Sequence, residues 1–325
     1  MGIRVEKVYL GIDVGSVSTN IVGMDDRESV VFAKYLRNDG QPLQVIQEGL
    51  KKIRNEFENL RIAGVGTTGS GRLLAGTMVG ADIVKNEITA HAYAAVHFYP
   101  EVRTILEIGG QDSKLIVIRN GVVSDFSMNT VCAAGTGSFL DHQAERLKVP
   151  IEDFGALALT AKKRVRIAGR CTVFAESDMI AKQQFGFSKA EIINGLCEAL
   201  VRNYLSNLGR DKQIIAPVLF QGGVAANQGI QSAFERELHT PVIVPPHFNV
   251  MGAIGAALLA RKQLRKGGSA TKFRGFERLL LDFSPTSFEC EGCSNGCEVI
   301  QVEQDGRVIA IWGDKCGKYS NGVSA

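Results

Sequence analysis

Residues 8–25, VYLGIDVGSVSTNIVGMD, decide the fold. An apolar run that ends near Asp13 is followed by a Gly/Ser turn and a second apolar run, the pattern of two strands joined by a tight turn. Residues 104–128, TILEIGGQDSKLIVIRNGVVSDFSM, repeat this plan and add a hairpin signal at Asn120–Gly121 before a third strand. The sequence therefore predicts two α/β halves, each of which begins with a meander of strands.

The remaining segments supply helices and further strands to each half. Leu43, Ile46, Leu50 and Ile53 have helical spacing, and the segment that follows the second meander is mostly helical. A basic, Gly/Ser-containing stretch then indicates a linker to a small appended module. The expected domains are 1–98 together with 250–266, then 99–249, a linker at 267–280 and a Cys-rich module at 281–325.

Composition and charge exclude several classes of function. With 45% hydrophobic residues the 325-residue chain can bury sizeable cores, so disorder is not expected. The formal charge is only +3, and the first 260 residues carry no dense Lys/Arg block, so neither nucleic acid nor an anionic membrane is an expected partner. No secretory segment opens the chain and no apolar run reaches the length of a bilayer span, which predicts a cytoplasmic protein.

The turn GIDVGS combines one carboxylate with several backbone N–H groups. Such a combination suits Mg²⁺ and phosphate, so Asp13 is predicted to hold the metal through water. The amides of Gly15, Ser16 and Val17 are predicted to face phosphate oxygens. A plain hairpin turn explains this stretch about as well.

The turn EIGGQDSK repeats the arrangement in the second half. Gly109 and Gly110 allow the backbone to approach a ligand closely, and Gln111 and Asp112 are expected to orient water and bind the hydration shell of the metal. Two such turns, each opening an α/β half, predict that phosphates are gripped from both sides of a cleft.

A third Gly-rich strand end, FQGGVAANQ, offers Gly222, Gly223 and Asn227 to a nucleoside, although a tight strand-to-helix turn would also explain it. The order of the three motifs resembles the superfamily of acetate and sugar kinases, heat-shock chaperones and actin. That resemblance covers residues 7 to about 265. It implies two ribonuclease-H-like domains that clamp ATP·Mg²⁺, with the Cys-rich β module appended.

Two cysteines stand where helices are expected to begin. Cys132 precedes a Gly135-Thr136-Gly137 turn that suits phosphate, and Cys171 precedes a second helix. The N-terminus of a helix favours a thiolate and a negatively charged cluster, because free N–H groups and the helix dipole point at it. A [4Fe–4S] cluster needs four thiolates, and a two-fold dimer would supply two cysteines from each chain. Two buried thiols are the alternative.

The segments NTVCAAGTGSFLD and RCTVFAES, together with GIDVGS, IGGQDSK and QGGVAAN, closely resemble the BadF/BadG/BcrA/BcrD-type ATPases. Within that family the resemblance is greatest to activators of 2-hydroxyacyl-CoA dehydratases. It implies an ATPase coupled to electron transfer in anaerobic metabolism, with one [4Fe–4S] cluster bridging a homodimer through Cys132 and Cys171. It also implies a donor such as ferredoxin or flavodoxin, and an iron–sulfur acceptor such as a dehydratase or a double-cubane-cluster protein.

The chain has seven cysteines, and four of them lie in the C-terminal module. Cys290, Cys293, Cys297 and Cys316 are separated by two, three and eighteen residues around an expected hairpin with an Asp-Gly turn. CxxC knuckles of this kind indicate a metal, with zinc preferred, a second iron–sulfur cluster next and a bare tail third. Cys197 lies on an apolar helical face and is predicted to be part of the core.

Two other classes of function remain open at the level of sequence. A sugar-kinase-like phosphotransferase would use the same nucleotide turns but would leave Cys132 and Cys171 without a role. A chaperone-like or regulatory ATPase with a zinc module would have no redox cofactor.

Overall fold

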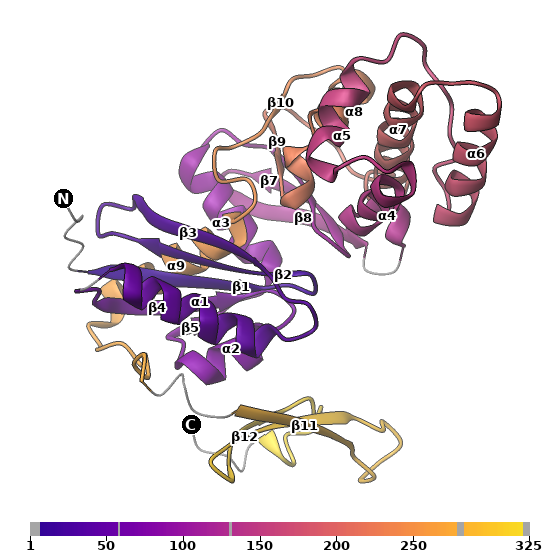
Figure 1. Ribbon diagram of the computed structural model, residues 1–325. Coiled ribbons are helices and arrows are strands. Elements are labelled where there is room, and N and C mark those ends of the chain that lie inside the picture. Colours follow the sequence, from indigo (N-terminus) through magenta and orange to yellow (C-terminus); the bar gives the residue numbers. More distant parts are fainter. Residues whose placement is uncertain (1–6, 58, 130–131, 278–282, 321–325) are drawn as a thin grey trace. The chain divides into compact units, whose positions relative to one another are not determined.

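The protein is described by a computed structural model that covers residues 7–57, 59–129, 132–277 and 283–320. The chain divides into two compact units, residues 1–86 with 256–325 and residues 87–255 (Figure 1). The sequence predicts domain limits at 98/99 and 249/250. In the structure, the helix Glu87–Phe98 belongs to the second unit, whereas the predicted limits place it in the first. Residues 278–282 and 321–325, which belong to the predicted linker and module, lie outside the described residues.

The first unit contains a five-stranded sheet in the order β3-β2-β1-β4-β5. β1 pairs antiparallel with β2, as the sequence predicts, and parallel with β4. The strands are β1 Val8–Val14, β2 Ser18–Met24, β3 Val30–Arg37, β4 Ile62–Thr68 and β5 Ile83–Val84. The helices are α1 Pro42–Glu56, α2 Arg72–Val79 and the greater part of α9 Met251–Gly267.

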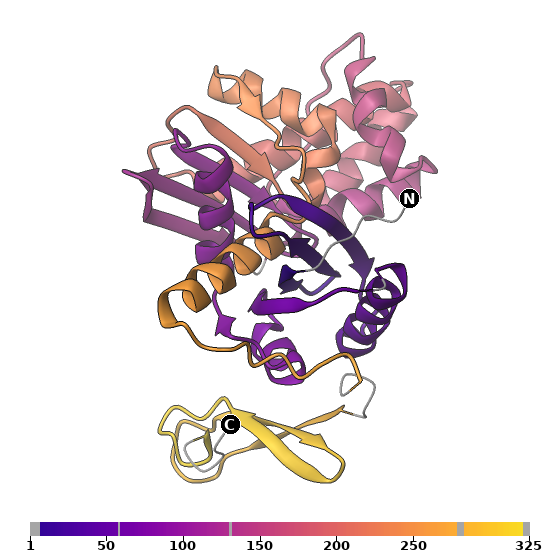
Figure 2. The ribbon, with the colours of Figure 1, turned by 90° about the vertical axis from the view of Figure 1, so that its left-hand side faces the viewer.

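Residues of β4 alternate between two layers of helices (Figures 1 and 2). A Cβ added at Gly66 would lie 2.1 Å from the Ala256 carbonyl oxygen of α9, so the backbone of α9 packs directly on this strand. The next residue, Thr67, points the other way, because its hydroxyl donates to the Arg72 carbonyl oxygen of α2 at 2.9 Å. The sheet therefore has α9 on one face and α2 on the other.

The second unit repeats the strand order, as β8-β7-β6-β9-β10. The hairpin predicted at Asn120–Gly121 is confirmed, since both residues have positive φ, 52° and 73°. The strands are β6 Thr104–Ile108, β7 Ser113–Arg119, β8 Val122–Asn129, β9 Val218–Gln221 and β10 Val242–Ile243. The helices are α3 Glu87–Phe98, the 3₁₀ turn η1 Ala133–Gly135, α4 Gly137–Leu147, α5 Ile151–Leu159, α6 Thr172–Gln184, α7 Lys189–Leu208, the 3₁₀ turn η2 Gly223–Ala226 and α8 Gln228–Leu238.

Helix α7 is the centre of the second core. Ser188 and Glu191 form a capping box at its N-terminus, which fixes where the helix begins. Most of its residues are buried, and the Tyr204 hydroxyl donates to the Lys114 carbonyl oxygen of β7 at 2.6 Å. The helix is thereby attached to the sheet at the strand that follows the second glycine turn.

The C-terminal module is a separate three-stranded antiparallel sheet in the order β11-β12-β13. Its strands are β11 Phe283–Glu289, β12 Glu298–Gln304 and β13 Arg307–Trp312. The Asp305–Gly306 hairpin is confirmed, with φ of 52° and 73°. Within the described ranges, no helix is long and apolar enough to cross a bilayer.

Candidate functional site

The first glycine turn is held in place by Asn38. Its amide donates to the Gly15 carbonyl oxygen at 2.7 Å, and its own oxygen accepts from the Thr19 hydroxyl at 2.6 Å. The Gly15 N–H donates to the Ser18 carbonyl oxygen inside the turn. Direct phosphate contact by the Gly15, Ser16 and Val17 amides stays a prediction, but the turn that carries them is fixed.

Buried polar atoms surround Asp13. In the sheet register Asp13 lies opposite Asn20 on one side and Thr68 on the other. Asn20 Oδ1 and Thr68 Oγ1 are buried and have no hydrogen-bond partner among the described residues. Because buried polar groups are normally paired, these orphaned oxygens fit a hydrated cation beside Asp13, whose water molecules can donate to them.

Only a glycine fits at position 69, next to the Asp13 carboxylate. Its φ is +92°, and an added Cβ would lie 2.6 Å from Asp13 Oδ1 and 2.3 Å from the Val14 carbonyl oxygen. No side chain fits there, because the space is occupied and the backbone is left-handed.

The second unit contains the same arrangement around Glu107, which the sequence did not single out. Glu107 lies opposite Gln221, and Gly222 follows with φ +91°. A Cβ at Gly222 would lie 2.8 Å from Glu107 Oε1 and 2.3 Å from the Ile108 carbonyl oxygen. Both side-chain polar atoms of Gln221 are buried without a partner in the part of the chain described. Glu107 is thus the counterpart of Asp13. Alignment of the segment EIGG with the segment DVGS could have identified it from the sequence, because Glu107 then takes the place of Asp13.

Lys114 neutralises the second turn from within the core. Only 2% of its side chain is exposed, and its ammonium lies 2.7 Å from Glu87, 2.9 Å from Glu107 and 2.9 Å from Asp112. Burial raises the pKa of Glu107 to about 8, against the attraction of Lys114 that lowers it. Burial lowers the pKa of Lys114, but the three carboxylates together raise it above its ordinary value. Asp112, predicted to bind the hydration shell of a metal, is therefore also a partner of Lys114.

The second glycine turn is hydrogen-bonded to the helix that follows Cys132. The Gly137 N–H donates to the Gly109 carbonyl oxygen at 2.9 Å, and the Ser138 N–H donates to the Gly110 carbonyl oxygen at 2.8 Å. The Ser138 hydroxyl also donates to the Gly110 oxygen, at 2.6 Å. The Gly137 N–H is thus engaged with protein, and direct phosphate contact at Gly135, Thr136 and Gly137 stays a prediction.

Both cysteines predicted to be cluster ligands occupy N-cap positions. Cys132 caps the 3₁₀ turn η1, and Cys171 caps α6, with no side-chain cap at either place. Asn129 fixes the first turn, because it accepts from the Cys132 N–H at 2.9 Å and donates to the Cys132 carbonyl oxygen at 2.8 Å. Both thiols are half-buried.

Asn203 of α7 lies between the two cysteine turns. Its amide donates to the Gly169 carbonyl oxygen, two residues before Cys171, at 2.6 Å. On the other side, its oxygen lies 2.9 Å from the position of a Cβ at Gly135. Sequence reasoning missed Asn203, because only the tertiary fold brings it to these turns.

The third Gly-rich strand end is a capped helix start. The Gly222 N–H donates to the Phe248 carbonyl oxygen, and Gly223 begins η2. Asn227 accepts from the Ile230 N–H at 3.0 Å and so caps α8. Contact of Gly222, Gly223 and Asn227 with a nucleoside stays a prediction, whereas capping explains why an asparagine stands at 227.

The other cysteines differ in burial. Cys197 is fully buried in the core, as predicted, and burial raises the pKa of its thiol to about 12. In the module, Cys290 is buried, Cys297 is half-buried, and Cys293 and Cys316 are exposed. Across residues 7–57, 59–129, 132–277 and 283–320, no three or more His, Cys, Asp or Glu side chains form a ready-made metal site.

The two repeated sheets and their glycine turns define an ATPase of the actin and sugar kinase type. The chain belongs to the BadF/BadG/BcrA/BcrD ATPase family, which matches residues 10–260. The (R)-2-hydroxyglutaryl-CoA dehydratase activating ATPase of Acidaminococcus fermentans is 38% identical over 262 residues, which are 79% of this chain and 98% of that one. The module at 283–320 lies outside the family match.

Solved structures agree with this family assignment. The activator of the 2-hydroxyisocaproyl-CoA dehydratase from Clostridium difficile, with bound ADPNP, superposes with a TM-score of 0.73 and 32% identity, covering 80% of this chain and 97% of that one. A ROK family glucokinase from Streptomyces griseus, in complex with glucose and AMPPNP, gives a TM-score of 0.50 at 14% identity, over 78% of this chain and 99% of that one. The glucokinase likeness shows the fold alone.

Proposed function

We propose that this protein is an ATP-dependent activator that uses ATP hydrolysis to deliver a low-potential electron to an iron–sulfur partner enzyme. The observation that carries the proposal is the direct hydrogen bonding of the phosphate turn at Gly109–Gly110 to the helix that follows Cys132. The proposal is supported by relatives that are named as activators of dehydratases and that this chain matches over nearly their whole length.

ATP and Mg²⁺ are assigned to the two acidic turns. Asp13 holds the hydrated cation, and the orphaned oxygens of Asn20 and Thr68 complete its polar surroundings. In the second turn, Gln111 and Asp112 orient the attacking water. Glu107 lies beside them and is held by Lys114.

The residues at Cys132 and Cys171 fit an iron–sulfur cluster. Both are N-cap residues without a side-chain cap, and the N–H groups at such a helix start would favour a negative charge at the thiolates. One chain contributes two thiols and a [4Fe–4S] cluster takes four, so two copies of the chain would hold one cluster. When bound, such a cluster supplies a one-electron carrier of low potential.

Coupling between nucleotide and cysteines follows from the hydrogen bonds of α4. A change at the Gly109–Gly110 carbonyl oxygens displaces the N–H groups of Gly137 and Ser138, and η1 with Cys132 immediately precedes them. Asn203 extends the same connection to the turn before Cys171. The nucleotide state and the position of both thiols are then parts of one conformational equilibrium.

The partners follow from the chemistry of electron transfer. The acceptor is an iron–sulfur enzyme such as a 2-hydroxyacyl-CoA dehydratase or a double-cubane-cluster protein, and the donor is a ferredoxin or flavodoxin. The protein acts as a homodimer in the cytoplasm.

Metal analysis of anaerobically purified protein tests the proposal. We expect about four irons and four sulfides per dimer. Cys132→Ser should lose this iron while keeping part of the ATP hydrolysis, and the matched variant Cys197→Ala should keep the iron. Protein without iron would contradict electron transfer and favour the phosphotransferase alternative, and acceptor reduction that proceeds with ADP alone would contradict the energy coupling.

A further inference from the structure

The C-terminal module has almost no hydrophobic core. In residues 283–320 the buried side chains are those of Cys290, Val299 and Val302, and every residue of β11 except half-buried Phe283 is exposed. A three-stranded sheet needs an apolar face or another constraint to be stable in water. Small domains that lack a core are held by disulfides, by a metal or by a partner. The module therefore needs a stabilising element beyond its own packing.

The topology of the sheet collects its four cysteines at one end. Glu289 at the end of β11 pairs with Glu298 at the start of β12, and the Cys290 N–H continues this ladder to the Cys297 carbonyl oxygen at 2.8 Å. The end of β13 reaches the same edge, because a Cβ at Gly313 would lie 2.3 Å from the Glu298 carbonyl oxygen. Cys293 lies in the loop between β11 and β12, and Cys316 follows β13.

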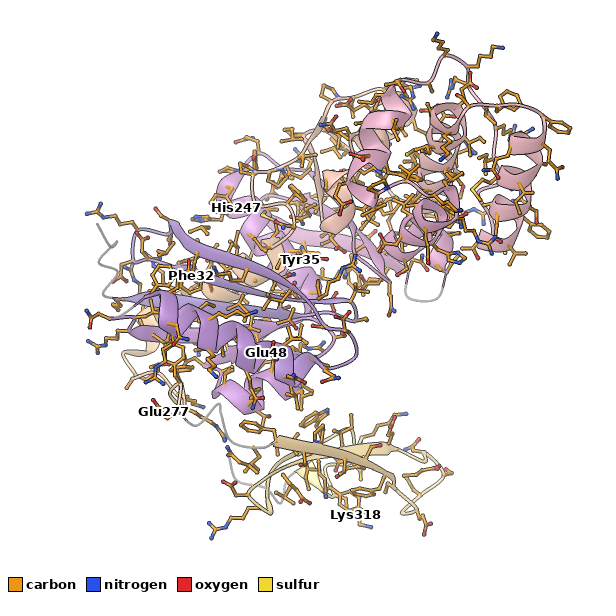
Figure 3. All side chains as sticks on the ribbon, viewed as in Figure 1. Phe32, Tyr35, Glu48, His247, Glu277 and Lys318 are labelled. Carbon is orange, nitrogen blue, oxygen red and sulfur yellow. The ribbon has the colours of Figure 1, made fainter. Side chains whose placement is uncertain are left out.

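The first CxxC segment is folded as a knuckle around a sulfur atom. The Gly292 N–H donates to Cys290 Sγ at 3.4 Å, a bond that is stronger when the sulfur is a thiolate. Lys318, labelled in Figure 3, belongs to the loop of Cys316. Its ammonium lies 3.4 Å from the position of a Cβ at Gly292, and Cys290 Sγ lies 3.3 Å from the same position. The two cysteine loops thus meet at Cys290.

We propose that Cys290, Cys293, Cys297 and Cys316 bind one zinc ion that replaces the missing core of the module. In the part of the chain that the structure describes, the four thiols do not lie close enough together to form one metal site. Zinc binding therefore requires the exposed side chains of Cys293 and Cys316 to rotate toward the knuckle. In small metal modules this ordering and metal binding are a single process, and the binding free energy becomes folding free energy.

Zinc fits this end of the sheet better than a second iron–sulfur cluster does. Zinc needs only four sulfurs at about 2.3 Å, whereas a cluster must also fit several irons and sulfides between the same four thiolates. The loops here are polar and exposed, with Glu291, Ser294 and Asn295 between the cysteines. A tetrathiolate zinc site would carry a charge of about −2, and the ammonium of Lys318, which lies near the Cys290 knuckle, would partly balance it.

The only tryptophan of the chain, Trp312, ends β13 and makes the test specific. In the full-length protein, excited where tryptophan but not tyrosine absorbs, its fluorescence reports on the module without signal from the ATPase units. We expect about one zinc per chain, a red shift of the emission when a strong chelator removes the zinc, and reversal when zinc is returned. A metal-free protein with unchanged Trp312 emission would overturn the proposal.

Variants on the exposed cysteines separate zinc binding from a general folding defect. Cys316→Ser should lower zinc to less than about a tenth per chain, whereas Cys316→His should keep it, because Cys₃His is also a structural zinc set. Cys197→Ala and Cys132→Ser are the controls and should keep the zinc. Three results would overturn the proposal. They are zinc that is retained in Cys316→Ser, iron and sulfide that are lost in this variant in place of zinc, and disulfides among these four cysteines. These outcomes do not depend on the iron at Cys132 and Cys171, so failure of the proposed function is seen separately.

Discussion

The two five-stranded sheets place an acidic residue at the same point, but the neighbouring strand presents a different residue to that carboxylate in each sheet. Asp13 and Glu107 each stand one residue before the end of the first strand, beside a glycine with positive φ. Opposite Asp13 on the second strand is Asn20, and opposite Glu107 is Lys114. A duplicated fold therefore gives two equivalent positions for a carboxylate. The residue across the ladder decides whether that carboxylate faces a neutral amide or a buried cation.

The largest expected effect is on ATP hydrolysis, and it tests whether Asp13 holds the metal or only supports the fold. Asp13→Asn removes the charge that attracts Mg²⁺ but keeps the shape of the side chain, so ATP hydrolysis should fall about 100-fold. Steady-state phosphate release measures the fall, and Asp211→Asn on the surface is the matched control. Unchanged hydrolysis in Asp13→Asn would show that the two acidic positions are not both nucleotide sites.

The next effect tests the buried cation of the second sheet. Lys114→Met leaves Glu87, Glu107 and Asp112 without their shared partner, so the free energy of unfolding should fall by about 3–5 kcal/mol. Lys212→Met breaks a more exposed pair with Asp125 and should cost less than about 1 kcal/mol. Urea unfolding of both variants gives the comparison, and equal losses would contradict the role assigned to Lys114.

Glu107 also makes the stability of the second unit depend on pH. Its pKa is raised from 4.5 to about 8, so the folded protein binds a proton that the unfolded chain releases between those values. This contribution to stability is fully present below pH 4.5 and is lost as the pH rises through 8. The groups that face Glu107 are Lys114, Asp112 and Glu87. Unfolding followed from pH 6 to about 9 should show a decline of at most about 1.4 kcal/mol per pH unit, and this decline should be absent in Glu107→Gln.

The smallest effects compare the residues that hold each glycine turn. Asn38→Ala should lower the free energy of unfolding by about 1–3 kcal/mol, because it leaves buried groups of the first turn unpaired. Ser138→Ala removes one hydrogen bond at the second turn and should cost about 0.5–1.5 kcal/mol. In the presence of ATP, Ser138→Ala is expected to reduce the effect of the nucleotide on the rate at which a chelator removes the iron, and an unchanged effect would contradict the coupling through α4.

Local patterns in the sequence were enough to predict most strands of the two five-stranded sheets, the two hairpins and both glycine turns, but not the short strand β5 or the third strand of the module. Alternating apolar residues and Asn-Gly or Asp-Gly pairs act over a few residues, so they can be read without the tertiary fold. Glu107 was missed because its role depends on Gly222 and Lys114, which the sheet brings beside it. Asn227 caps α8, and its contact with a nucleoside stays a prediction, because a helix cap and a ligand contact use the same residue type.

The hydrogen bonds between the second glycine turn and α4 determine which mutations can break the coupling between nucleotide and cysteines. Two of the three bonds join main-chain atoms, which every residue except proline supplies. Most single codon changes at Ser138 therefore leave its N–H donor in place, whereas at Gly137 an added Cβ would lie 3.0 Å from the Gly109 carbonyl oxygen and crowd the turn. A genetic screen for uncoupled variants should therefore return substitutions of Gly137, Ser138→Pro, or insertions and deletions that shift α4 along the turn.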